Sequence, residues 1–217
     1  DAITFNDDAM IGVMRLLKEI TQEQSNFRWV KPAERERCQQ ALARALRVLL
    51  DCQIVVDGKK TAWCQQHDHE TLKPVKARSY ELPSISGVES VKIVSYLMEE
   101  EAPSAKIVEA VEGAVAWFRR SAIRGIRIEQ FDIDSVKDGD KVIEHDERVV
   151  RDPDAKPVWA RFYEIDTNRP FFCNRDGIKV YTLAEVTLER RTGYSWYSDA
   201  AAKLLEKEYP KWLERLK

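Results

Sequence analysis

The chain has 217 residues, of which 44% are hydrophobic and 33% are charged, and its formal net charge is −2. This length fits one fairly large domain with a buried core. The near-neutral charge excludes the strong overall positive charge that is typical of many nucleic-acid-binding proteins. No window approaches the run of about 20 apolar residues that spans a membrane. The opening sequence DAITFNDDAM has neither the basic start nor the apolar core of a signal peptide.

Helical periodicity dominates the first part of the chain. Either Asp7 or Asp8 can cap a helix N-terminus, and apolar residues then recur at helical spacing as far as Ile20. Residues 22–30 form a connection. Pro32 then suits the first turn of a long helix, which ends before the turn dipeptide Asp57-Gly58.

The later part of the chain mixes helices with strands. Helices are expected after the capping-box sequence Ser86 to Glu89 and after Ser104. Residues 123–130 and 159–165 alternate apolar and polar side chains, which predicts strands, whereas the acidic residues 131–157 favour turns and short strands. The last predicted elements are helices over 183–191 and 198–216. This pattern predicts helical hairpins with a small strand-bearing insertion.

A polar and aromatic stretch from Thr61 to Ser84 separates two of the helical segments. Pro74 and Pro83 interrupt helical periodicity there, so the backbone is expected to be irregular. Residues 67–70 (His-Asp-His-Glu) are all possible zinc ligands, but the spacing of established zinc sites is missing, and zinc is not favoured. The alternative to a binding or catalytic role for this stretch is a surface loop whose acidic residues cap the neighbouring helices.

The cysteines are irregularly spaced and fit no metal-ligand pattern. They are Cys38, Cys52, Cys64 and Cys173. We interpret them mostly as small buried apolar residues, and pairing of Cys64 with Cys173 stays open.

Two other groups of residues could carry chemistry. Asp7 and Asp8 provide carboxylates of the kind that calcium prefers, although capping of a helix explains one of them equally well. Arg161, Arg169 and Arg175 surround an aromatic loop, and guanidinium groups bind carboxylates in a bidentate manner, which suits a polyanionic substrate. Taken alone, these arginines would favour surface salt bridges with the preceding acidic stretch.

Six separate segments resemble the family 10 polysaccharide lyases, the pectate lyases: ITFNDDAM, TAWCQQHD, ARSYELPSISGVESV, WARFYEIDTNRPFF, NRDG and ERRTGYSWY. The resemblance runs along essentially the whole chain. It implies a mainly α fold, an (α/α) toroid of paired helices with a few short strands in a late insertion. Residues 1–217 would then be one domain, the later part of a catalytic domain. The implied activity is calcium-assisted anti β-elimination of polygalacturonate by a secreted or periplasmic protein.

The resemblance also implies roles for individual arginines. Arg78, in ARSYEL, stands at the motif position of the arginine that abstracts the proton. Arg161 in WARFYE and Arg175 in NRDG match arginines that hold substrate carboxylates, and Arg169 is a further candidate that could equally brace its loop. An arginine base is unusual because its pKa is about 12.5 or higher, but desolvation and neighbouring cations both favour the neutral form.

Calcium is the cofactor that the resemblance implies, with Asp7 and Asp8 as its local ligands and Asp68 as a third group near substrate or metal. Elimination removes a proton alpha to a carboxylate, and a bridging calcium ion would neutralise charge in the enolate-like transition state.

The family's domain extends upstream of ITFNDDAM and supplies a further acidic residue, so this chain alone is expected to be weakly active or inactive. For the same reason an apolar patch is expected around Ile11, Val13, Met14 and Leu17, covered by the upstream part of the domain or by self-association. Two other functions remain open. One is a non-catalytic polygalacturonate-binding protein, and the other is a helical-toroid hydrolase using paired carboxylates.

Overall fold

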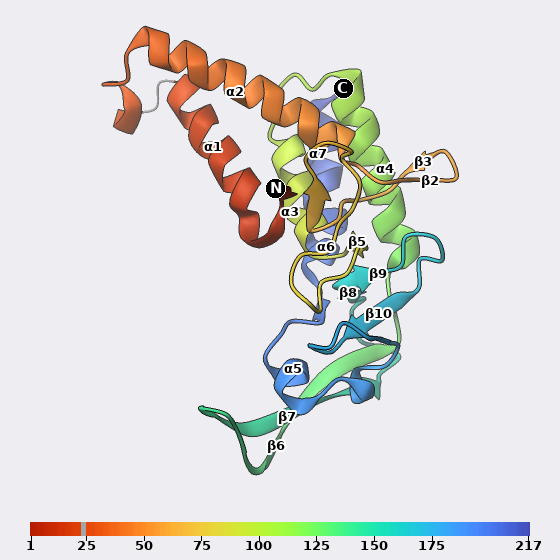
Figure 1. The fold of residues 1–217 in the computed structure, drawn as a ribbon. Coiled ribbons are helices and arrows are strands. Elements are labelled where there is room, and N and C mark those ends of the chain that lie inside the picture. The colour runs from red at the N-terminus through yellow and green to blue at the C-terminus, as the bar shows by residue number, and fades with distance from the viewer. Residues whose placement is uncertain (23–24) are drawn as a thin grey trace.

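The computed structural model describes residues 1–22 and 25–217, and its fold is mixed, with 42% helix and 24% strand in several small sheets. The expectation of a mainly α toroid is therefore wrong. Figure 1 shows helices at one end of the molecule and a long β-hairpin at the other, with short strands between them. The expected connection over 22–30 contains a 3₁₀ turn, η2 (Ser25–Phe27), while its residues 23 and 24 lie outside the described part.

The helices follow the apolar periodicity closely. They are α1 (Ala9–Thr21), α2 (Pro32–Asp51), α3 (Glu89–Met98), α4 (Ala105–Ser121), α5 (Leu188–Thr192), α6 (Ala200–Lys203) and α7 (Tyr209–Arg215). The first two form a helical hairpin, drawn in red and orange in Figure 1. Pro32 stands in the first turn of α2, where its missing N–H has no helical partner to lose. The expected helix over 183–191 is divided into a 3₁₀ turn, η3 (Leu183–Glu185), and α5.

The last helix runs almost continuously to the C-terminus, as expected. A π-helical turn, η4 (Leu204–Glu208), joins α6 to α7 and ends two residues before Pro210. A proline inside a helix lacks its N–H and clashes with the carbonyl four residues earlier, and one wider turn relieves that conflict.

Most strands are short. They are β1 (Ala2–Thr4), β2 (Val55–Val56), β3 (Lys59–Lys60), β4 (Gln66–Asp68), β5 (Ile85–Ser86), β8 (Trp159–Ala160), β9 (Phe162–Tyr163), β10 (Pro170–Cys173), β11 (Lys179–Val180) and β12 (Tyr197–Ser198). A four-stranded sheet has the order β11-β10-β9-β5, and all of its pairings are antiparallel. Asp57 and Gly58 join β2 to β3 with positive φ values of 50° and 72°, which fits the hairpin turn expected of Asp-Gly.

The acidic residues 131–157 were expected to form turns and short strands, and this expectation is wrong. They contribute to one long antiparallel hairpin, β6 (Ile126–Asp138) and β7 (Lys141–Arg151), with an irregularity between Asp132 and Val136. The alternation noted over 123–130 correctly predicts the start of β6, whereas the following residues 131–151 are mostly solvent-exposed and charged, so no half-buried strand was expected there. Ion pairs such as Arg148–Glu129 (2.6 Å) join the two strands.

The interior contains two apolar clusters. The larger lies among the helices and includes the fully buried Trp63, Trp117 and Trp212. The smaller, which we call the aromatic cluster, lies between the helices and the hairpin. It consists of Tyr80, Phe162, Phe171, Phe172, Cys173, Leu183, Val186 and Trp196, with Leu82, Val180, Tyr194 and Tyr197 packed against it. The aromatic cluster supports the loops that carry the candidate site.

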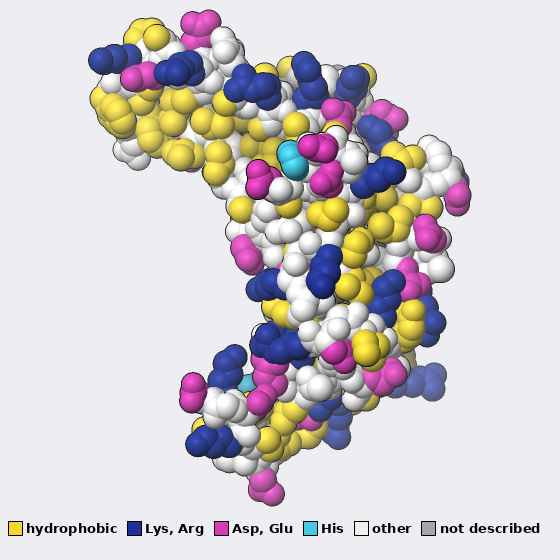
Figure 2. All heavy atoms as spheres, in the orientation of Figure 1, with side chains coloured by type: hydrophobic (Ala, Val, Ile, Leu, Met, Phe, Trp, Pro, Cys, Tyr) yellow, Lys and Arg dark blue, Asp and Glu magenta, His cyan; other side chains and the backbone are white. Residues whose placement is uncertain are grey.

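An exposed apolar patch is present on α1, but its residues differ from those expected. Ile11 and Met14 are buried at 1% exposure, whereas Val13 (55%) and Leu16 (46%) are exposed and Leu17 is half-buried. Figure 2 shows hydrophobic side chains spread over the α1–α2 hairpin.

All four cysteines are described, and each is a free thiol. Among the described residues no helix is both long and apolar enough to cross a membrane.

Candidate active site

A hollow of about 510 Å³ brings together residues from distant parts of the sequence. Its lining consists of Asp7, Arg78, Glu147, Arg161 and residues 192–195. Three of these, Asp7, Arg78 and Arg161, were singled out in the sequence as candidates for metal binding, catalysis and substrate binding. We call this hollow the arginine hollow.

Arg78 begins a tight turn that ends at Glu81. The Glu81 N–H donates to the Arg78 carbonyl at 2.9 Å, and the Arg78 N–H donates to Glu81 Oε2 at 3.1 Å. The side chains then form a bidentate pair, with Nε donating to Oε2 at 2.8 Å and Nη2 to Oε1 at 2.5 Å. The Arg78 side chain is nevertheless 48% exposed, and its Nη1 donates to no described residue. One edge of this guanidinium is thus available to a substrate in the arginine hollow.

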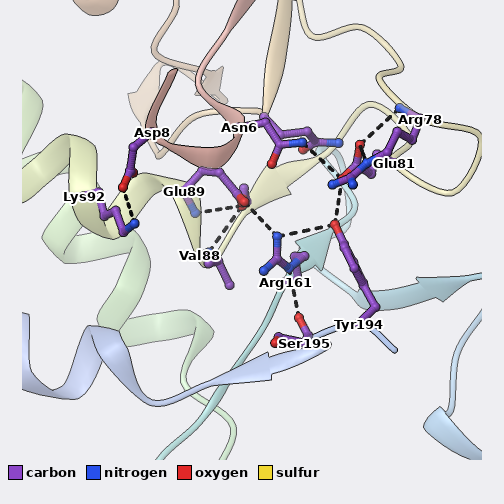
Figure 3. A network of polar contacts seen from close by, with 12 residues as sticks. Asn6, Asp8, Arg78, Glu81, Val88, Glu89, Lys92, Arg161, Tyr194 and Ser195 are labelled. Atoms are coloured by element: carbon purple, nitrogen blue, oxygen red, sulfur yellow. Dashed lines mark hydrogen bonds and ion pairs between the residues drawn. The ribbon is translucent and has the colours of Figure 1, made fainter. Parts of the chain in front are cut away.

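Glu81 is a buried carboxylate that sequence reasoning missed. Its Oε1 also accepts hydrogen bonds from the Tyr194 hydroxyl at 2.7 Å and from Asn6 Nδ2 at 3.2 Å (Figure 3). Burial raises the pKa of Glu81, but hydrogen bonds from Arg78 and Tyr194 outweigh it and hold that pKa below its ordinary value. The hydrogen bonds to Glu81 raise the pKa of Arg78 well above its ordinary value. Arg78 is therefore held as a cation in the free protein.

The backbone of Arg161 is fixed between β8 and β9. Its N–H donates to the Trp196 carbonyl at 2.8 Å, and its own carbonyl accepts from the Gly87 N–H at 2.9 Å. A Cβ at Gly87 would lie only 2.2 Å from the Ala160 carbonyl oxygen, so this close approach requires glycine.

The Arg161 side chain is held by three groups. Nε donates to the Ser195 carbonyl at 2.9 Å, and Nη1 donates to Glu89 Oε1 at 2.8 Å and to the Tyr194 hydroxyl at 3.4 Å (Figure 3). Glu89 is the first residue of α3, and its backbone N–H donates to Ser86 Oγ at 3.2 Å. The expected capping sequence thus places a buried carboxylate against Arg161. Nη2 of Arg161 donates to no described residue, which leaves it free for an anionic ligand.

The two aspartates at the start of α1 have different roles. Both adopt left-handed backbone conformations, with φ of 51° at Asp7 and 61° at Asp8, and neither side chain caps the helix. Asp7 is exposed and lines the arginine hollow. Asp8 instead forms an ion pair with Lys92 on α3 (Figure 3). Asp7 is thus the better placed of the two for a metal or substrate.

Arg175 and Arg169 lie outside the arginine hollow. Arg175 lines a neighbouring cavity of about 750 Å³ beside the tip of the β6–β7 hairpin, and it forms a bidentate pair with Glu189 at 3.0 and 2.6 Å. Arg169 packs on the Tyr181 ring, with its guanidinium carbon 3.5 Å from the ring centroid. Arg169 therefore has the position expected of a residue that braces its loop.

The residues that suggested zinc hold the local backbone together. Asp68 Oδ1 accepts hydrogen bonds from the Thr71 N–H and hydroxyl at 2.7 and 2.8 Å, which lowers the pKa of Asp68. His67 is buried, and its ring nitrogens contact the Cys64 N–H at 3.1 Å and the Leu72 carbonyl at 2.9 Å. His69 is exposed. Both ring nitrogens of His67 are thus occupied, so it has no free position for a metal.

The lining residue Glu147 was also missed, because it lies on β7, in a region that was expected to form turns and short strands. Its side chain is half-buried, and burial raises its pKa. A clearer signal existed for Glu81, since an acidic residue three positions after Arg78 suits a tight turn with an ion pair. Nothing in the sequence linked Tyr194 to Arg78 across more than a hundred residues.

A calcium ion is only partly accommodated by the described residues. Calcium takes 6–8 oxygen ligands, whereas no group of three metal-binding side chains is present among residues 1–22 and 25–217. Asp7 is exposed in the arginine hollow and could supply one carboxylate, while Asp8 is occupied by Lys92. Further ligands would have to come from substrate carboxylates, water or other polypeptide.

Residues 1–205 match the family model described as pectic acid lyase. No curated protein matches the chain. The structure is similar to that of a family 10 polysaccharide lyase from Cellvibrio cellulosa, with a TM-score of 0.83 and 32% identity over 97% of this chain and 62% of that one. A mutant of the family 10 enzyme from the same bacterium, in complex with trigalacturonic acid, gives the same TM-score and identity over 97% and 63% of the two chains. The chain thus spans less than two thirds of these matched structures.

Proposed function

Because the chain belongs to the pectic acid lyase family, we propose that it cleaves polygalacturonate by anti β-elimination, with Arg78 as the proton acceptor. The observation that carries the proposal is the grouping of Arg78, Arg161 and Asp7 around one hollow. Two guanidinium groups there have nitrogens without partners among the described residues, which suits a ligand bearing carboxylates.

In this proposal Arg161 binds and orients a galacturonate unit. Nη2 of Arg161 donates to a carboxylate of the substrate, while Glu89 and the Ser195 carbonyl fix the rest of the guanidinium. The positive charge of Arg161 stabilises the negative charge that develops on the substrate as the reaction proceeds. The proton alpha to the bound carboxylate therefore becomes easier to remove.

Arg78 then receives that proton at Nη1, the nitrogen with no partner among the described residues. The C5–H bond breaks, a C4–C5 double bond forms, and the C4–O4 bond breaks with its electron pair leaving on the glycosidic oxygen. Only the neutral guanidine can accept a proton, and Glu81 disfavours that form. The reaction is therefore expected to speed up toward alkaline pH.

We also propose calcium as the cofactor, with Asp7 as its ligand from the arginine hollow. When bound, the ion would supply positive charge next to the substrate carboxylate and stabilise the enolate-like transition state. We further propose a location outside the cytoplasm, where a polymeric substrate such as pectate is accessible.

The test is the ultraviolet absorbance of the products, because elimination leaves a double bond conjugated with a carboxylate and hydrolysis does not. Polygalacturonate and trigalacturonate are incubated with the protein in calcium, in excess chelator, and in chelator followed by calcium. We expect absorbance to rise only in calcium and to recover on its return. Full activity in chelator would contradict the metal-assisted reaction, and new reducing ends without absorbance would identify a hydrolase. Binding of trigalacturonate without any cleavage would identify a carbohydrate-binding protein.

A further inference from the structure

Tyr194 lies between the two arginines to which the proposed function assigns chemistry. It follows α5 in the segment RRTGYSWY, and it lines the arginine hollow. Its ring packs edge-on against Tyr80 and Trp196, with centroid separations of 5.1 and 4.9 Å. The aromatic cluster therefore fixes the plane of the ring and leaves the hydroxyl at the edge of the hollow.

The Tyr194 hydroxyl connects the two arginine–glutamate pairs. It donates to Glu81 Oε1 at 2.7 Å and accepts from Arg161 Nη1 at 3.4 Å. Because Glu81 Oε1 also accepts from Arg78 and Arg161 Nη1 also donates to Glu89, one continuous chain of polar contacts runs from Arg78 to α3 (Figure 3).

The face of the same ring lies close to three cations. The centroid is 4.5 Å from the guanidinium carbon of Arg161, 5.2 Å from that of Arg190 and 5.7 Å from that of Arg78. An aromatic face attracts cations, so the ring partly offsets their mutual repulsion. Burial raises the pKa of the Tyr194 hydroxyl, which keeps it neutral and able to donate.

We infer that Tyr194 is a positioning residue that fixes the Arg78 and Arg161 guanidinium groups relative to each other, so that both meet one substrate unit. This role rests on the proposed function, because it assumes that the two arginines act on the same galacturonate. Tyr194 acts through Glu81 and Arg161 and transfers no proton itself.

The test uses Tyr194→Phe, which removes the hydroxyl and keeps the ring. Tyr181→Phe is a matched control, because Tyr181 donates to the Glu164 carboxylate at 2.8 Å and lies outside the arginine hollow. We expect Tyr194→Phe to lower kcat about tenfold with KM changed less than about twofold, since one hydrogen bond to a charged group is lost. Tyr181→Phe should behave as wild type.

A second measurement separates positioning from a general structural effect. The Nε–H proton of Arg78 donates to Glu81, and that of Arg175 donates to Glu189, so their hydrogen exchange can be followed by NMR in one sample. In Tyr194→Phe we expect exchange at Arg78 to quicken several-fold and exchange at Arg175 to stay unchanged. A further variant, Tyr194→Leu, also removes the ring face under Arg161, and it should additionally raise KM several-fold.

The exchange measurement decides the inference independently of catalysis. Faster exchange at Arg78 alone supports it, whether or not the wild-type chain produces absorbing products. Unchanged exchange at Arg78 in Tyr194→Phe overturns it, even if activity falls. Absence of products from wild type in calcium contradicts the proposed function and leaves the exchange result to decide the role of Tyr194.

Discussion

Two arginine–glutamate pairs in this protein have nearly the same geometry and different surroundings. Arg78–Glu81 and Arg175–Glu189 both join Nε to Oε2 and Nη2 to Oε1, at 2.8 and 2.5 Å in the first pair and 3.0 and 2.6 Å in the second. The Glu81 side chain is fully buried and accepts from Tyr194 as well, whereas Glu189 is 14% exposed and Arg175 is 59% exposed. Bidentate geometry alone therefore does not identify the functional arginine. Burial of its partner and connection to a second cation distinguish Arg78.

The largest expected difference between the two pairs is in turnover. Arg78→Ala should lower kcat about 10³-fold with little change in KM, because general base catalysis typically contributes 10²–10⁴-fold. Arg175→Ala should leave both kcat and KM within about twofold of wild type, because Arg175 lies outside the arginine hollow. Both values come from initial rates of product absorbance.

Arg127→Ala is the control for these variants. Arg127 has the same side-chain exposure as Arg78, 48%, and pairs with Glu129 at 2.8 Å on the β-hairpin. It should retain wild-type kinetics. Normal turnover by Arg78→Ala would show that the base is misassigned.

Stability should separate the two glutamates. Glu81→Ala leaves Arg78, Tyr194 and Asn6 without their shared acceptor, and we expect the free energy of unfolding to fall by about 3 kcal/mol. Glu189→Ala removes a pair whose arginine is 59% exposed, and it should cost less than about 1 kcal/mol. Urea denaturation followed by tryptophan fluorescence measures both. Equal losses would mean that burial of Glu81 adds nothing to the pair.

The dependence of rate on alkaline pH sharpens the comparison further. Glu81 raises the pKa of Arg78, so the neutral guanidine is a small fraction that grows about tenfold for each pH unit. We expect kcat to rise with a slope near one on a logarithmic scale until the protein unfolds. Arg78→Lys should level off near the lysine pKa of about 10.4 if it retains activity. A wild-type rate that is flat between neutral and alkaline pH would contradict an arginine base.

The smallest effect is expected in acid. Hydrogen bonds hold the pKa of Glu81 below its unfolded value of about 4.3, so this carboxylate stabilises the fold above that pH. Its contribution should be lost as pH falls through the folded pKa. The stability gap between wild type and Glu81→Gln should therefore narrow as the pH falls below about 4.3. A gap that stays constant to lower pH would show that the carboxylate is not ionised in the folded protein.

Much of the candidate site could be predicted from sequence because the residues belong to distinctive motifs. NDDAM, ARSYEL and WARFYE supplied Asp7, Arg78 and Arg161, and the fold brings these three to one hollow. The separate positions of Arg169 and Asp68 could not be read from their motifs, since a motif does not say which way a loop turns. The motif likewise did not indicate that Asp8 pairs with Lys92 on another helix.

The fold class was harder to predict, for a physical reason. Helices with one buried face have a clear period, and α1, α2, α3 and α4 were found near their observed positions. Beyond residue 130 the β6–β7 hairpin is held by backbone pairing and ion pairs across a mostly exposed surface, so most of its length could not be told from turns. Two-residue strands such as β8 and β9 depend on tertiary partners and have too few residues to form a pattern.

The left-handed backbone at Asp7 and Asp8 restricts which amino acids these two positions can accept. Asp, Asn and Gly tolerate a positive φ at low cost, whereas other side chains are strained there. An alanine scan would therefore mix backbone strain with loss of the carboxylate and would overstate the importance of either charge. Asn removes the charge alone, and Gly removes the whole side chain while keeping the turn. For a protein engineer, Asp, Asn and Gly are therefore the suitable residues at positions 7 and 8. Other substitutions will change the backbone of the loop before they test its chemistry.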